Sequence, residues 1–184
     1  MTSTSNSLAS STNATLGDAI ANPADERQNP KSKIQNPPDS FKMSFAPLAL
    51  EEVYQLADDG ANGAIVVMSG MVRNQTEGKP VVALEYQAYE PMAINVFRQI
   101  AMEIRGQWPD VTHVVIHHRT GKLTVGEISV LVAVGCPHRS EAFASCKYAI
   151  DTLKHNAPIW KKEHWQDGST SWVSIAACEN QEDC

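Results

Sequence analysis

The sequence predicts an α+β fold in which two main helices pack on a mainly antiparallel sheet. Three observations support this: apolar residues recur at helical spacing in two long segments, β-branched runs of strand length lie between them, and short glycine-containing links join neighbouring runs. Short links favour hairpins, which pair strands in the antiparallel sense. With 184 residues, 42% of them hydrophobic, the chain can supply one ordinary domain rather than two.

Two amphipathic segments are the clearest helices. They span residues 90–108 and 140–155, and each carries its apolar residues on one stripe. A shorter helix is predicted at residues 47–57, where a proline begins a segment of acidic and apolar residues. Strands are predicted at residues 61–73, 80–89, 111–118, 127–136, 159–165 and 172–176. The expected order of elements is therefore α-β-β-α-β-β-α-β-β.

Residues 1–44 are predicted to be a disordered extension, and residues 45–184 are predicted to form the folded domain. The extension is rich in Ser, Thr, Asn, Ala and Pro and has no aromatic residue before Phe41. Such a segment cannot bury enough apolar surface to offset the entropy lost on ordering. It also lacks a basic stretch followed by an apolar one, so no secretory signal is visible and a cytoplasmic location is predicted.

The charge balance argues against a general nucleic-acid-binding protein. The net charge is −6, and residues 1–44 contribute none of it, so the domain is acidic and would repel a phosphate backbone. An anion site on this domain must be a local cluster of cations. The apolar runs are far shorter than the roughly 18–20 residues that span a bilayer, so no membrane contact is predicted. The four cysteines form no C-x-x-C pair, which predicts reduced thiols and no structural metal.

Basic residues mark both ends of the second long helix. His138 and Arg139 lie at its start, where free backbone N–H groups and the helix dipole favour an anion, so they are a candidate phosphate site. A solvent-exposed pair beside a neighbouring carboxylate is the alternative.

Three lysines follow at or beyond the end of that helix. Lys154 lies in the last predicted turn, and Lys161 and Lys162 come just after it in the next strand. Clustered ammonium groups make a neutral, reactive amine easier to reach, whereas the alternative is a lysine that only complements the helix dipole. Alternation along the strand places Ile159, Lys161 and Glu163 on one face, so Lys161 and Lys162 are not expected to share a role.

Other polar residues give weaker signals. Arg73 ends a predicted strand after Gly70, where another backbone could approach closely, although a solvated charge is the usual explanation. His117 and His118 are adjacent on a strand and therefore point to opposite faces, which disfavours a shared metal ion. Cys146 falls on the apolar stripe of a helix, where a buried, inert thiol is expected rather than a sulfur carrier.

Several uncommon segments, taken in order, resemble the large subunit of molybdopterin synthase, the MoaE family. They are Gly70-Met-Val-Arg73, Leu84-Glu-Tyr-Gln-Ala-Tyr89, the run from His118 to Glu127, His138-Arg139, Leu153-Lys154, Pro158-Ile-Trp-Lys-Lys-Glu163 and Trp172-Val173. The resemblance spans nearly all of residues 45–176, and the recurrence of several rare combinations in one order makes it specific.

The resemblance implies an α/β-hammerhead-type fold and a sulfurtransferase activity. It implies a central homodimer within a heterotetramer, with a small ubiquitin-like sulfur-carrier subunit bound at each end. The tail of that subunit ends in a thiocarboxylate that carries one sulfur, and the family inserts two such sulfurs into cyclic pyranopterin monophosphate to form molybdopterin. No metal or nucleotide cofactor is implied for the large subunit.

The resemblance also implies roles for five residues. Lys154 matches the family's essential lysine and Lys161 a second catalytic lysine, both serving proton transfer and stabilisation of negative charge as sulfur adds. Arg73, His138 and Arg139 match positions that hold the substrate phosphate, some of them across the dimer.

Two other functions stay open on the residues alone. One is a non-catalytic module that binds the tail of a ubiquitin-like protein. The other is a phosphate-ester hydrolase that uses His117 or His138.

Overall fold

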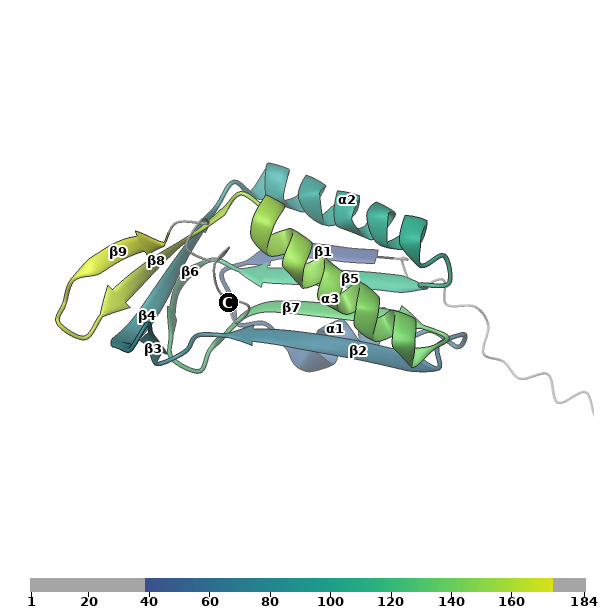
Figure 1. The fold of residues 1–184 in the computed structure, drawn as a ribbon, viewed down its shortest axis with the longest axis horizontal. Helices are drawn as coiled ribbons and strands as arrows, with labels where there is room; N and C mark the ends of the chain where they lie inside the picture. The colour runs from purple at the N-terminus through teal and green to yellow at the C-terminus, as the bar shows by residue number, and fades with distance from the viewer. Residues whose placement is uncertain (1–38, 174–184) are drawn as a thin grey trace, which may run out of the picture. The chain divides into compact units, whose positions relative to one another are not determined.

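The computed structural model describes residues 39–173 (Figure 1). In chain order, these residues form β1 (Asp39–Ser44), α1 (Leu50–Ala57), β2 (Ala64–Met71), β3 (Gln75–Thr76), β4 (Lys79–Ala88), α2 (Glu90–Gln107), β5 (His113–Arg119), β6 (Gly121–Thr124), β7 (Ile128–Cys136), α3 (Arg139–Asn156), β8 (Ile159–Trp165) and β9 (Thr170–Val173). No helix within these residues is long and apolar enough to cross a membrane.

The first sheet has the strand order β1-β5-β7-β2 and carries helices on both faces. Only β1 and β5 pair in parallel, whereas β7 is antiparallel to both β5 and β2. Helices α2 and α3 lie side by side on one face (Figure 1), where Phe97, Ile100 and Ile104 of α2 are almost fully buried. On the other face, Val53 of α1 packs against Leu131 and the neighbouring apolar residues.

The second sheet has the strand order β3-β4-β8-β9, and β6 pairs with β4. All of its pairings are antiparallel. A small core of Val72, Val81, Leu84 and Leu123 joins this sheet to the segment that follows β2. In Figure 1 this sheet lies at the end of the first sheet to which α3 points with its carboxyl end.

A proline marks the start of one long helix and the end of the other. Helix α2 has a proline in its first turn, which is compatible with a helix start because no intrahelical N–H bond is lost there. Helix α3 ends at Asn156, and Ala157 takes an extended conformation, with ψ of 134°, because the next residue is Pro158. The chain then enters β8 directly, so the last turn of α3 and the first residues of β8 are held close together.

The predicted α+β class with a mainly antiparallel arrangement and two main helices is confirmed. The bounds of β8 are the ones predicted, and β4, α2 and α3 begin and end within about two residues of the prediction. The short strands β3 and β6 were missed because two and four residues give too little alternation to detect. The predicted last strand overlaps β9, and residues 174–176 lie outside the described residues.

The predicted boundary at residue 45 was wrong, because residues 39–44 form strand β1. This strand is ordered by partners far along the chain. Phe41 and Met43 pack against the main core, and the Asp39 carboxylate accepts two hydrogen bonds from the Arg105 guanidinium, at 2.6 and 2.9 Å. The amide of Val114 donates a further bond to Asp39 at 3.0 Å. Residues 1–38 of the predicted extension lie outside the described residues.

Candidate functional site

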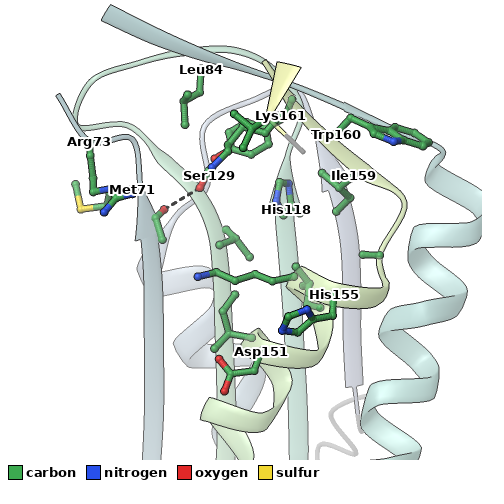
Figure 2. Close-up of a pocket in the computed structure, with 18 of the residues that line it drawn as sticks. Met71, Arg73, Leu84, His118, Ser129, Asp151, His155, Ile159, Trp160 and Lys161 are labelled. Atoms are coloured by element: carbon green, nitrogen blue, oxygen red, sulfur yellow. Dashed lines mark hydrogen bonds between the residues drawn. The ribbon is translucent and has the colours of Figure 1, made fainter. Parts of the chain in front are cut away.

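A cavity of about 460 Å³ lies between the two sheets and the carboxyl end of α3 (Figure 2). Its lining comes from α3, from all strands except β1 and β6, and from the loop after β2, so segments distant in the sequence meet around it. Three of the five predicted site residues, Arg73, Lys154 and Lys161, line this cavity. The structure therefore brings three cations to one place on an acidic protein.

Each of the three cations is positioned by a different element. Lys154 lies in the last turn of α3, just before the proline break. Lys161 lies in β8 opposite Tyr86 of β4, to which it is paired in the sheet. Arg73 follows β2, whose pairing with β7 is interrupted by a bulge at Gly70 and Met71. The bulge ends the strand and turns the chain toward the second sheet.

The close approach predicted at Gly70 is present, but the neighbour is a side chain rather than a backbone. A Cβ atom added at Gly70 would lie 2.6 Å from Cγ1 of Val130 and 3.6 Å from the hydroxyl of Ser129. A larger residue here would displace the wall of the cavity, because Val130 and Ser129 both line it.

The predicted separation of Lys161 from Lys162 is confirmed. Ile159, Lys161 and Glu163, which share one face of β8, all line the cavity. The ammonium of Lys162 instead lies 5.5 Å from the centre of the Trp172 ring, a cation–π contact outside the cavity lining. Adjacent lysines thus have different surroundings.

His138 and Arg139 do not join the cavity of their own chain. His138 is the N-cap residue of α3 and Arg139 is its first residue, and both side chains are exposed. Lys154 is fifteen residues further along the same helix, which at 1.5 Å per residue is about 22 Å. A role for this pair at the cavity therefore requires a second copy of the chain.

The neighbouring histidines of β5 face opposite sides of the first sheet, as predicted. His117 is 1% exposed, lies on the α1 side and has its Nε2 atom 3.0 Å from the hydroxyl of Ser40. Burial lowers the pKa of His117, while the nearby Glu52 carboxylate acts in the opposite direction. His118 faces the other way and lines the cavity.

Among the polar residues of the cavity wall that were not singled out from the sequence as site residues are Tyr86, His118, Ser129 and Glu163. Burial raises the pKa of the Tyr86 hydroxyl, and a hydrogen bond with Ser129 opposes this shift. The Ser129 hydroxyl donates to the carbonyl of Gly70 at 3.2 Å, the dashed line in Figure 2.

Glu163 is the most buried carboxylate of the lining, at 3% exposure, and its Oε1 accepts a hydrogen bond from the Thr76 hydroxyl at 2.9 Å. The alternation of β8 already placed Glu163 beside Lys161, so the sequence contained a signal for this residue. The positions of the other three depend on how the two sheets meet.

The described cysteines are buried, free thiols. Burial raises the pKa of Cys146 to about 11, so this thiol stays protonated and unreactive near neutral pH, as predicted from its place on the apolar stripe. Burial also raises the pKa of Cys136, which lies at the end of β7.

Comparison with known proteins identifies relatives over most of the described chain. Residues 43–156 match the family model of MoaE proteins. The molybdopterin synthase catalytic subunit of Nostoc sp. is 78% identical over 141 residues, which cover 77% of this chain and 86% of that protein. The crystal structure of molybdopterin synthase from Staphylococcus aureus aligns with a TM-score of 0.70 and 40% identity, covering 73% of this chain and 96% of that one.

A more distant structure shares the fold. It is a complex of subunits 1 and 2 of molybdopterin-converting factor from Helicobacter pylori, with a TM-score of 0.60 and 22% identity over 73% of this chain and 90% of that one. The family model covers more than half of the sequence, and the Nostoc relative is matched over most of its length. The chain therefore belongs to the MoaE protein family.

Proposed function

We propose that the chain is the catalytic subunit of a molybdopterin synthase and acts as a sulfurtransferase. In this proposal it moves two sulfurs, one from each of two thiocarboxylated tails of small ubiquitin-like subunits, to cyclic pyranopterin monophosphate. The single observation that carries the proposal is the convergence of Arg73, Lys154 and Lys161 on one cavity. Membership of the MoaE family supports the same reaction.

The cavity suits a reaction between two anions. The substrate carries a phosphate and the donor tail ends in a thiocarboxylate, so both need cations at close range. The planar guanidinium of Arg73 can form two parallel hydrogen bonds to a phosphate. Lys154 and Lys161 would stabilise the negative charge that develops as sulfur adds, and would transfer protons to the product.

We further propose that His138 and Arg139 contribute to the cavity of a partner copy in a homodimer. Within one chain they lie about 22 Å along α3 from Lys154, too far to touch the same small ligand. The exposed N-terminus of α3 can hold an anion if a second chain brings it there. The Helicobacter pylori complex contains two kinds of subunit. For this chain we propose a heterotetramer built from the homodimer and two small subunits.

We also propose a cytoplasmic location. The described thiols Cys136 and Cys146 are unpaired and buried, as is usual in a reducing compartment.

A reconstituted reaction tests the proposed function. Purified chain, thiocarboxylated small subunit and cyclic pyranopterin monophosphate are mixed, and the dithiolene product is measured. Product is expected only when the small subunit carries the thiocarboxylate. Lys154→Ala should lose product formation while the small subunit still binds. Binding of the thiocarboxylated small subunit without any dithiolene product from the wild-type chain would favour a binding module. Hydrolysis of a phosphate ester without the small subunit would favour a hydrolase.

A further inference from the structure

His118 is a buried histidine whose ring forms part of the cavity wall. Its side chain is 4% exposed, and it extends from β5 into the cavity, between Ser129 and Ile159 in the view of Figure 2. The proposed reaction as derived above gives this side chain no task. A buried polar group in a ligand cavity needs an explanation, because burying one without a partner is unfavourable.

The hydrogen bonding of His118 defines its tautomer. Its Nδ1 atom lies 2.8 Å from the carbonyl oxygen of Arg119, which can only accept, so Nδ1 carries the proton and donates. The Nε2 atom then bears a lone pair. Within residues 39–173 no hydrogen bond is found for Nε2, and this atom is not among those fully sealed from solvent. Burial lowers the pKa of His118 to about 4, so the ring is neutral at physiological pH.

Neighbouring groups hold the ring in this orientation. Tyr86 packs against it edge to face, with ring centres 5.2 Å apart and planes at 73°. The residue that supplies the accepting carbonyl, Arg119, is itself held by Glu127 through an ion pair at 2.7 Å. The Nε2 lone pair is therefore a preorganised acceptor, which reduces the entropy lost when a ligand binds.

The rest of the cavity explains why such an acceptor is needed. Arg73, Lys154 and Lys161 can only donate hydrogen bonds, so they suit the anionic parts of a ligand. A pterin heterocycle also presents N–H donors, which need acceptors when they leave water. Glu163 is one acceptor of the lining, but its Oε1 already accepts from Thr76. The Nε2 atom of His118 has no such competing bond among the described residues.

We propose that Nε2 of His118 accepts a hydrogen bond from a ring N–H or amino group of the pterin, making His118 a substrate-binding residue. This inference rests on the proposed function and assigns different parts of the substrate to different groups of the cavity. The cations hold the phosphate and the incoming thiocarboxylate, and the neutral imidazole holds the heterocycle. His118 thereby selects a ligand that presents an N–H donor at a fixed position relative to its anionic end.

Two substitutions of similar size test the inference in the assembled complex with thiocarboxylated small subunit. In His118→Gln the amide oxygen can reach the position of Nε2 and still accept, whereas His118→Leu has no acceptor. His118→Leu should raise KM for cyclic pyranopterin monophosphate about tenfold or more, with little change in kcat, and His118→Gln should stay within about threefold of the wild type. Competitive inhibition by inorganic phosphate should be unchanged in both variants, because phosphate occupies the cationic part alone.

Several results would overturn the inference. The first is an unchanged KM in the leucine variant, and the second is an equal rise in KM in both variants. The third is a weakening of phosphate inhibition that accompanies the rise in KM, because this would indicate a distorted cavity. If the leucine variant does not fold, the wild type still decides the question by ¹⁵N NMR. The Nε2 resonance of His118, assigned by its absence in His118→Gln, should shift when cyclic pyranopterin monophosphate binds. Binding without that shift would refute the role of His118, whereas a wild-type complex that makes no product would refute the proposed function instead.

Discussion

The buried state of His118 predicts a measurable loss of stability in mild acid. Burial lowers its pKa from 6.5 to about 4, so between these values the unfolded chain binds a proton that the folded chain does not. The stability that this neutral side chain contributes is fully present above the unfolded pKa and is lost as the pH falls toward the folded pKa. For one such group, lowering the pH from about 7 to about 5 reduces the free energy of unfolding by about 2 kcal/mol.

Urea unfolding followed by tryptophan fluorescence measures this loss at the two pH values, at one fixed protein concentration. His118→Gln cannot take up the proton at this position. Its free energy of unfolding should therefore fall by about 2 kcal/mol less than that of the wild type over the same change in pH. His117, whose pKa is also lowered by burial, remains in both proteins and cancels in the comparison. Equal acid-induced losses in wild type and variant would refute the assignment of a buried, neutral His118.

Two further substitutions, one with a matched control, test the packing and anchoring of the first sheet. Gly135→Ala would place a Cβ atom 2.4 Å from Nδ2 of Asn62 and 2.5 Å from the carbonyl oxygen of Ala57. The free energy of unfolding, measured by thermal unfolding, should therefore fall by about 2 kcal/mol or more. The control Gly106→Ala, whose Cβ atom would have no atom within 4 Å, should be neutral or stabilising. Arg105→Ala removes both hydrogen bonds that anchor Asp39 of β1. It should lower the free energy of unfolding by about 1–2 kcal/mol and speed amide hydrogen exchange in β1. Unchanged exchange in β1 would contradict this anchoring role.

Local sequence patterns predicted the elements that bury a continuous apolar stripe. Helices α2 and α3 were found this way, because every third or fourth residue in them faces one core. Strand β1 was missed because its six residues follow a segment of polar composition and its partners lie more than sixty positions away. A parallel edge strand joined to its partner by a long crossover leaves no hairpin signal.

The candidate site was predictable only in part, for a similar reason. Alternation along one strand separated Lys161 from Lys162, and helical position placed Lys154 close to Lys161 across the proline break. That Arg73 and His118 join the same cavity depends on how two sheets meet. His118 sits in a β-branched run next to another histidine, so the sequence raised only the question of a shared metal ion. That Nε2 of His118 is available as an acceptor follows only from the folded structure, in which Nδ1 faces the Arg119 carbonyl and the ring packs against Tyr86.

If cations from separate segments act together in one cavity, two adjacent lysines should differ sharply in their effect on the reaction. Single-turnover formation of the dithiolene product is measured in complexes assembled with thiocarboxylated small subunit and saturating cyclic pyranopterin monophosphate. Lys161→Ala, in the cavity, should slow the reaction by about 100-fold or more, and Lys162→Ala, beside Trp172, should stay within about threefold of wild type. Equal losses in the two variants, or an undiminished rate in Lys161→Ala, would show that the cavity cations do not act together.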